Sequence, residues 1–262
     1  MKFCSLYSGS SGNSLFVSNN NTKILIDAGL SGKRIQSALD IIAEDPREIN
    51  GIMVTHEHSD HIHGVGVLSR RFNLPIYANQ KTWDAMIKGL GKIAEENIKI
   101  FDFEKPFCIQ DLQIKAFKTS HDAADSAGFV ISDGKNRLGI ATDSGIITPE
   151  MRSDLCGCDL VVLESNHDVS MLEAGAYPFY LKQRIKSDFG HLSNETAGDL
   201  AQALVEKGTR QLVLAHLSQE NNYPQLAYQT TARILSEAGM VLDKDVKLCV
   251  AKRNSTSEII NL

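Results

Sequence analysis

Short apolar runs separated by polar, glycine-rich turns dominate the first half of the chain. Residues 1–27 read as three strands, with a glycine- and serine-rich turn after the first strand and Asn19-Asn20-Asn21 at the tip of the hairpin that follows. Further β runs are expected near residues 98–103, 107–117, 127–132 and 137–142. These runs indicate that strands make up most of the middle of the chain.

Helical periodicity appears between and after these runs. Apolar positions at helical spacing and the candidate N-cap Ser31 predict a helix over residues 31–43, which Asp45-Pro46 ends. A second helix is expected over residues 82–90, after a short strand at 76–78. This order suits two sheets flanked by helices better than a doubly wound parallel sheet, although periodicity alone indicates only a mixed α and β fold.

The second half repeats an order of strand, polar residue and helix. Apolar runs at 159–163 and 211–215 lead to Glu164 and His216, respectively. Between them, an apolar stripe predicts a helix with Ser193 as its N-cap and Gly208 as its terminator. The length of 262 residues is ample for one large domain or two fused halves.

The densest chemistry lies in the segment Thr55-His56-Glu57-His58-Ser59-Asp60-His61, at the exit of a predicted strand. Alternate side chains of an extended chain project the same way, so His56 and His58 can bind one metal ion together. Asp60 and His61 come next, where a helical period begins, and would face a second ion. The alternative is a surface loop that happens to be rich in histidine, but the alternation and the strand-to-helix setting favour metal ligands.

Two ions need further ligands, and polar residues of the right kind follow later strands. His121 comes after the strand-like residues 112–117, Asp143 ends the apolar run 138–142, and His216 ends 212–215. Residues at strand ends are where a rigid scaffold presents functional groups.

The order His-x-His-x-Asp-His, His, Asp, His resembles the metallo-β-lactamase superfamily of binuclear hydrolases. Residues 24–29 are similar to the first motif of that superfamily, whose aspartate, here Asp27, supports the metal site from behind its ligands. The segments 8–14, 164–168, 190–194 and 215–218, with Asn221-Asn222, resemble the bacterial YycJ (WalJ) branch. The resemblance extends from near residue 1 to about residue 254, and it implies an αββα sandwich of four layers. We therefore expect a single domain over residues 1–262 with two pseudo-repeated halves.

Seven residues are assigned as ligands of two divalent ions. We assign His56, His58 and His121 to the first ion and Asp60, His61 and His216 to the second, with Asp143 between them. All of these are nitrogen or oxygen donors without a thiolate, which favours zinc and leaves manganese or iron compatible.

Candidate substrate contacts surround these ligands. The loop of residues 8–14 either contacts a phosphate group through its backbone N–H groups or is a flexible turn between strands. It lacks the Gly-Lys-Ser/Thr ending of a P-loop. The resemblance favours an active-site rim there, with Ser10 and Asn13 as substrate contacts. It likewise favours Asn166, His167 and Ser218 as substrate contacts.

His191 comes just before a predicted helix. A histidine at this position either contacts an anion or is a surface or helix-capping residue. The resemblance favours a function, and we assign His191 as the general acid. His63 lies on the wrong side of a helical turn from His61 and is expected to be structural. Phe179, Tyr180, Tyr223 and Tyr228 are either core or substrate wall, and the pattern does not separate these.

Composition is that of an ordinary globular protein, with 42% hydrophobic and 23% charged residues. The net charge of -5 argues mildly against a generally basic nucleic-acid binder, and basic clusters such as Lys182/Arg184/Lys186 read first as solvated surface charge. No apolar run approaches the ~18 residues of a membrane span and no signal peptide is recognisable, so a cytoplasmic protein without membrane contact is expected. The five cysteines are expected to be reduced core thiols, Cys156 and Cys158 included.

Such a site would hydrolyse an ester. Two ions about 3.5 to 4 Å apart can share a water and lower its pKa, and the resulting hydroxide would be the nucleophile. Asp60 and His191 are the catalytic residues of this hypothesis. The resemblance implies a DNase or RNase acting on a nucleic-acid substrate, with attack from a 5′ end.

The sequence leaves three alternatives to a nuclease. A small-molecule phosphodiesterase or a thioester or lactone hydrolase of the same fold is the first. An inactive metal-binding protein is disfavoured because all seven ligand positions are filled. A β-lactamase is disfavoured because no secretion signal is recognisable.

Overall fold

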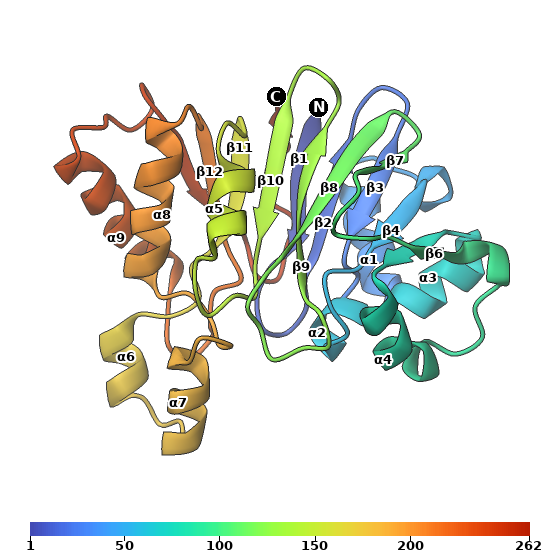
Figure 1. Cartoon of the computed structure of the whole chain (residues 1–262), viewed down its shortest axis with the longest axis horizontal. Helices are drawn as coiled ribbons and strands as arrows, with labels where there is room; N and C mark the ends of the chain where they lie inside the picture. The colour runs from blue at the N-terminus through green and yellow to red at the C-terminus, as the bar shows by residue number, and fades with distance from the viewer.

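The computed structural model describes residues 1–262, which form two seven-stranded sheets covered by helices (Figure 1). The first sheet has the order β14-β1-β2-β3-β4-β5-β6 and the second β13-β12-β11-β10-β9-β8-β7. The strands of the first sheet are β1 (Lys2–Tyr7), β2 (Ser14–Ser18), β3 (Lys23–Ile26), β4 (Gly51–Met53), β5 (Ile76–Ala78), β6 (Ile98–Ile100) and β14 (Ile260–Asn261). Those of the second are β7 (Phe107–Ile109), β8 (Leu112–Lys118), β9 (Ala127–Ser132), β10 (Arg137–Ala141), β11 (Leu160–Glu164), β12 (Gln211–Ala215) and β13 (Lys247–Val250).

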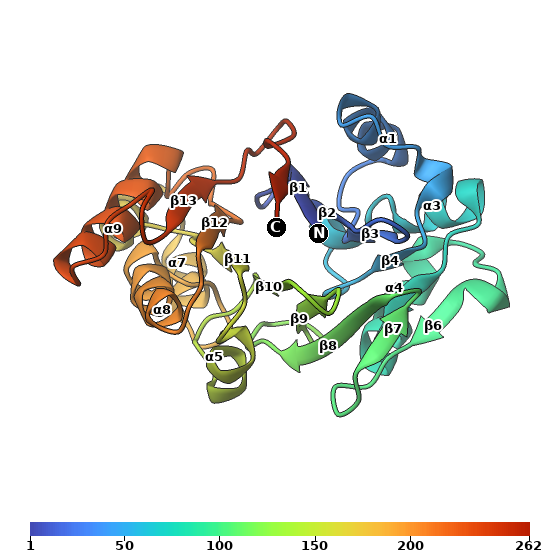
Figure 2. The same ribbon diagram turned by 90° about the horizontal axis from the view of Figure 1, so that it is seen from above.

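Helices occupy the outer faces of both sheets, and two further helices project beside them. They are α1 (Gly32–Ile41), α2 (Ser59–Ile62), α3 (Val65–Phe72), α4 (Gln80–Leu90), α5 (Pro149–Leu155), α6 (Val169–Ala174), α7 (Phe179–Lys186), α8 (Asn194–Glu206) and α9 (Pro224–Glu237). Figure 2 shows the two sheets facing each other, with α1, α3 and α4 on one outer side and α5, α8 and α9 on the other. The four-layer αββα sandwich is confirmed. No helix combines the length and apolar character needed to cross a membrane.

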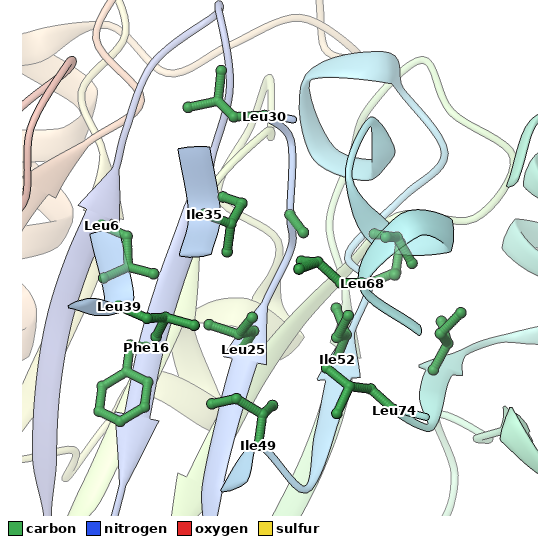
Figure 3. Close-up of a cluster of buried hydrophobic side chains, with 14 of the residues drawn as sticks. Leu6, Phe16, Leu25, Leu30, Ile35, Leu39, Ile49, Ile52, Leu68 and Leu74 are labelled. Atoms are coloured by element: carbon green, nitrogen blue, oxygen red, sulfur yellow. The ribbon is translucent and has the colours of Figure 1, made fainter. Parts of the chain in front are cut away.

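Strand positions alternate between two buried faces, which is why the strands read as continuous apolar runs. In β3, Ile24 and Ile26 point between the sheets, whereas Leu25 points to the outer helices. Figure 3 shows Leu25 and Ile52 of the first sheet beside Ile35 of α1 and Leu68 of α3. A matching cluster under α5, α8 and α9 covers the second sheet. The core between the two sheets contains side chains from both halves of the chain. The division into a single domain with two related halves remains a prediction.

The direction of the strands decides where the polar residues meet. Strands β3 to β6 run parallel, as do β10 to β13, and β8 runs in the same direction as β10 because each is antiparallel to β9. Parallel strands end at the same edge of a sheet, so the segments after β8, β10 and β12 are brought together. The segment after β4 comes from the facing sheet and meets them there, since the ring centroids of His56 and His121 lie 5.1 Å apart.

Two helices begin where the predicted capping residues place them, and a third begins slightly earlier than predicted. The side chains of Ser31 and Ser193 accept hydrogen bonds from the backbone amides of Arg34 and Thr196, at the starts of α1 and α8. The helix predicted over 82–90 starts two residues earlier, because the side chain of Asn79 caps it.

Two predicted segments differ from the structure. The helical period after Asp60 is divided into α2 and α3, because the backbone amide of Gly64 donates to the carbonyl oxygen of Ala28 at 2.7 Å. The run 107–117 is a hairpin of β7 and β8, which Gln110 allows with a left-handed φ of 52°. All five cysteines are free, but Cys108 and Cys249 are exposed rather than in the core, because they lie on the edge strands β7 and β13.

Gly29 is the tightest point between the loop after β3 and the helix α2. A Cβ atom at this position would lie 1.6 Å from the carbonyl oxygen of Asp60 and 2.7 Å from the amide nitrogen of Asn13. Both atoms belong to the backbone, so neither can rotate away. We therefore expect Gly29→Ala to lower the free energy of unfolding by about 3 kcal/mol, as overpacking does, measured by denaturant titration.

The matched control is Gly89→Ala, in α4, where nothing lies within 4 Å of the added Cβ. Alanine in a helix interior should raise stability by about 0.5–1 kcal/mol. Two variants of equal stability would contradict the packing described for Gly29.

Candidate metal centre

The structure brings all seven predicted ligands together at the edge where the parallel strands end. His56 and His58 leave β4, and Asp60 and His61 lie at α2. The remaining three follow β8, β10 and β12, and they are His121, Asp143 and His216. Two sets of three, His56/His58/His121 and Asp60/His61/His216, each have ligand atoms within 4.8 Å of one another. These are the two sets that the sequence assigned to separate ions.

The first set presents three imidazole nitrogens. His56 Nε2 lies 3.1 Å from His58 Nδ1, close to the separation of about 3.3 Å expected for two ligands of tetrahedral zinc. His56 Nδ1 lies 3.0 Å from Thr55 Oγ1, which leaves Nε2 for a metal. His121 Nδ1 donates to the carbonyl oxygen of Gly190 at 3.1 Å, so its Nε2 carries the lone pair.

The second set is supported from behind by Asp27. Asp27 Oδ2 lies 2.7 Å from His61 Nδ1 and also accepts from Thr55 Oγ1 at 2.8 Å, while Oδ1 accepts from the Thr55 amide. His61 Nε2 therefore faces Asp60 Oδ2 at 3.5 Å. His216 Nε2 lies 3.8 Å from the same oxygen.

Asp143 lies between the two sets. Its Oδ2 is 3.4 Å from His61 Nε2, and its Oδ1 is 3.8 Å from His121 Nε2. The backbones of Asp27, Asp143 and His216 all adopt a left-handed φ, between 55° and 60°. This conformation is unfavourable for residues other than glycine, and it concentrates here at the ends of three strands.

Two buried polar atoms test whether cations fit this cluster. Asp143 Oδ2 and His216 Nε2 have no hydrogen-bond partner within the chain, although both are buried. Leaving such atoms unpaired is costly, and a cation between them would satisfy both. The residues present therefore fit divalent metal ions.

The charges of the cluster also favour a cation. Burial disfavours a charged His216, but Asp143, Asp60 and Glu164 outweigh it and raise its pKa to about 10. The pKa of His61 is raised for a similar reason, because Asp27 and Asp143 outweigh its burial. Burial and the neighbouring histidines hold the pKa of His56 well below its ordinary value. The cluster thus stabilises positive charge next to its carboxylates, and burial with the neighbouring histidines keeps His56 neutral.

Glu164 is a candidate site residue to which the sequence interpretation assigned no role. It is fully buried at the end of β11, and its Oε1 lies 2.8 Å from His191 Nδ1 and 2.9 Å from His216 Nδ1. Its Oε2 accepts from the backbone amides of Ser144 and Leu192. Glu164 also belongs to a group with Asp143, His191 and His216 whose ligand atoms lie within 4.8 Å of one another. Because both of its oxygens already accept hydrogen bonds, its contacts favour a role in orienting the two histidines. An acidic residue ending an apolar strand was the available signal.

The predicted substrate contacts divide into two groups. Asn13 Nδ2 lies 3.1 Å from His61 Nε2, directly at the ligands, and Ser10 is exposed and lines a pocket of about 380 Å³ beside Asp60. Asn166, His167 and Ser218 are buried instead. Asn166 Nδ2 donates to the carbonyl oxygen of His216 at 2.9 Å, and the Ser218 amide donates to the Asn166 carbonyl at 2.7 Å. These contacts favour a role in holding the His216 loop over direct contact with substrate.

Two histidines outside the ligand set differ in their surroundings. Burial lowers the pKa of His167 to about 4, so its ring is neutral near pH 7. His63 is exposed and lines the pocket next to Asp60 together with Arg34. The expected structural role of His63 therefore gains no support from packing.

Comparison with known proteins decides the family. Residues 22–217 match the family model described as a Beta-lactamase superfamily domain. The chain belongs to the metallo-β-lactamase superfamily. Exodeoxyribonuclease WalJ of Streptococcus pneumoniae is 41% identical over 249 residues, which are 94% of this chain and 93% of that protein. Exodeoxyribonuclease YycJ of Bacillus anthracis is 40% identical over 239 residues, 91% of this chain and 90% of that protein.

Solved structures show the same fold at low sequence identity. The metallo-beta-lactamase fold protein YhfI from Bacillus subtilis superposes with a TM-score of 0.71 at 18% identity, covering 98% of this chain and 99% of that chain. Zn²⁺-bound PqqB from Methylobacterium extorquens superposes with a TM-score of 0.72 at 19% identity, covering 98% of this chain and 100% of that chain. The likeness to YhfI supports the metallo-β-lactamase fold over the whole length of the chain.

The contacts of Glu164 lead to a prediction about metal affinity. Glu164→Gln replaces one acceptor oxygen by a donor, so the side chain cannot accept from His191, His216 and two backbone amides together. We expect affinity for Zn²⁺ to fall by about 10- to 100-fold, measured by competition with a chelator of known affinity.

Glu237→Gln is the matched control, since Glu237 is an exposed residue of α9 whose side chain pairs only with Arg233. It should leave zinc affinity unchanged. Wild-type affinity in Glu164→Gln would show that Glu164 does not position the ligands.

Proposed function

We propose that this protein is a metal-dependent exodeoxyribonuclease that hydrolyses phosphodiester bonds at a pair of divalent ions. The observation that carries the proposal is the position of Asp143 between two sets of nitrogen and oxygen donors. The full-length similarity to two proteins named exodeoxyribonucleases favours DNA as the substrate. Zinc suits the donor set best, and manganese or iron is compatible.

Each set of ligands would hold one ion, with Asp143 shared between the two. Ions bound there would supply a Lewis acid for a phosphoryl oxygen and lower the pKa of a bound water. Asn13 places its side-chain amide next to His61 and Asp60, where it can donate a hydrogen bond to a phosphate oxygen. Ser10 and Arg34 line the adjoining pocket and can contact the next phosphate.

His191 would protonate the leaving oxygen. Its ring lies between those of His121 and His216, at centroid distances of 5.0 and 5.3 Å, and its side chain is 16% exposed. Glu164 engages Nδ1, and Nε2 makes no hydrogen bond within the chain, so it is the ring nitrogen available to a substrate. A donor in this position can pass its proton to the departing oxygen of the nucleotide.

Attack from a 5′ end and a cytoplasmic location complete the proposal. All five cysteines are free thiols, which is the usual state in a reducing compartment. Cell fractionation that found the protein outside the cytoplasm would refute the location.

The first prediction concerns the substrate. Metal-loaded protein incubated with DNA labelled at either end should release a 5′ label as mononucleotide before a 3′ label, analysed by gel electrophoresis. Asp143→Asn should lose at least about 100-fold in rate, because it removes a shared charged ligand. Glu237→Gln should degrade DNA like the wild type.

Release of the 3′ label before the 5′ label would show that the enzyme attacks from the 3′ end instead. Faster degradation of RNA than of DNA would contradict the choice of substrate. Turnover of aryl phosphodiesters, thioesters or lactones without any degradation of oligonucleotides would reject the nuclease proposal and retain the metal centre.

The second prediction concerns His191. A DNA strand leaves as an alkoxide that needs a proton, whereas a nitrophenolate leaves without one. We expect His191→Ala to slow DNA hydrolysis by about 10²- to 10⁴-fold, and to slow hydrolysis of bis(p-nitrophenyl) phosphate far less. Equal losses on both substrates would make His191 a binding residue.

A further inference from the structure

Helix α7 and the turn after it expose aromatic side chains to an unusual degree. Phe179, Tyr180 and Phe189 are 76%, 74% and 60% exposed, and with Tyr223 they are the exposed large aromatics of the molecule. Phe179 and Tyr180 are therefore not core residues. Three such residues within one short segment are more than scattered surface apolar groups, and clusters of this kind mark interaction sites.

Cations follow these aromatics at helical spacing. On α7, Arg184 lies four residues after Tyr180, and Lys182 lies three residues after Phe179. Residues at these spacings share one face of a helix. Ile185 is the buried residue of α7, whereas the exposed Phe179 and Tyr180 point away from the core.

The two faces have different neighbours. Lys182 Nζ donates to the carbonyl oxygen of Glu173 at 2.7 Å, which turns the Phe179 face toward α6. Arg184 Nε donates to Asp122 Oδ2, which turns the Tyr180 face toward the loop after β8. That loop carries the ligand His121.

The Tyr180 face borders the metal centre. Asp122 Oδ1 lies 3.4 Å from His121 Nε2, and the Asp122 amide donates to the carbonyl oxygen of Phe189 at 3.1 Å. The next residue, Gly190, accepts from His121 Nδ1. In Figure 1, α6 and α7 project at the same end of the molecule as α2, which carries Asp60 and His61.

Arg184 is prepared for an anion. Asp122 engages only Nε of the guanidinium group, and neither Nη atom makes a hydrogen bond within the chain. The side chain of Arg184 is 50% exposed, so the two Nη groups face solvent beside the site. A fixed guanidinium with free donors is suited to phosphate.

We propose that Tyr180 and Phe189 stack on unpaired terminal bases of a DNA strand whose backbone passes Arg184 on its way to the metal centre. This inference rests on the proposed nuclease function and names the form of DNA that the site accepts. Bases inside a duplex stack on one another, and a blunt end exposes only the outer face of its last base pair. A frayed or single-stranded end instead offers the faces of separate bases to both side chains. The basic side chains of Lys182 and Arg184 lie beside the aromatic residues, which favours a negatively charged ligand such as DNA over an apolar surface of another protein.

The test is binding of fluorescent oligonucleotides to metal-loaded protein, measured by anisotropy. Phosphorothioate linkages slow cleavage, and a strand with an unpaired end is compared with a blunt duplex of the same length. The wild type should bind the unpaired end more tightly. Tyr180→Ala and Phe189→Ala should each weaken this binding by about tenfold, the loss typical of one stacked base.

Two further substitutions separate stacking from simple apolar contact. Tyr180→Trp should retain tight binding, whereas Tyr180→Leu should bind as weakly as Tyr180→Ala. Ile100→Ala is the control for an exposed apolar residue elsewhere, since Ile100 is 56% exposed on β6. Zinc content and melting temperature establish that each variant is folded and loaded.

The outcomes distinguish the inference from the function on which it rests. Wild-type binding by Tyr180→Ala and Phe189→Ala, or by Tyr180→Leu, would overturn the stacking surface while DNA degradation stands. Equal affinity of the wild type for blunt and unpaired ends would also overturn it. If the wild type neither bound nor degraded DNA, the proposed function itself would fall.

Discussion

Buried carboxylates at the carboxyl ends of parallel strands are the constraint on which the site depends. Asp27 and Glu164 are almost inaccessible to solvent, and a charge in such a place is tolerated only when it is paired. Asp27 pairs with His61 and one backbone amide, and Glu164 pairs with two histidines and two backbone amides. These contacts restrict the orientation of the three imidazole rings. Asp143, which lies between the two sets of candidate ligands, keeps an oxygen without a hydrogen-bond partner. In the proposed metal centre, this remaining negative charge would attract a cation on either side of Asp143.

This arrangement links folding to chemistry through the same groups. Glu164 fixes a ligand, His216, and the proposed acid, His191, with one oxygen atom. The segment before His191 supplies the carbonyl that orients His121 and continues back into α7, which carries Tyr180. The residues proposed for substrate binding, proton transfer and metal binding are therefore connected through this one segment of the chain. If the proposed roles hold, a change in that segment should affect several steps of the reaction together.

Much of this organisation could be predicted because it is local in sequence. Alternation and strand exits identified seven candidate ligands that the structure brings together, and the caps Ser31 and Ser193 marked two helices. The remainder depends on tertiary contacts. The role of Glu164 requires His191 and His216, which are 27 and 52 residues away in sequence. The break at Gly64 requires the backbone of Ala28, and the burial of Asn166 requires the His216 loop. Hydrophobic periodicity reports local secondary structure, so it does not predict contacts between residues that are distant in sequence.

The central claim is that one cleft holds two cations on either side of Asp143. Anomalous X-ray diffraction from crystals of the zinc-loaded protein would locate them directly. The account predicts two peaks about 3.5 to 4 Å apart, one among His56, His58 and His121 and the other among Asp60, His61 and His216. A single peak, or zinc bound elsewhere on the protein with none beside Asp143, would contradict it.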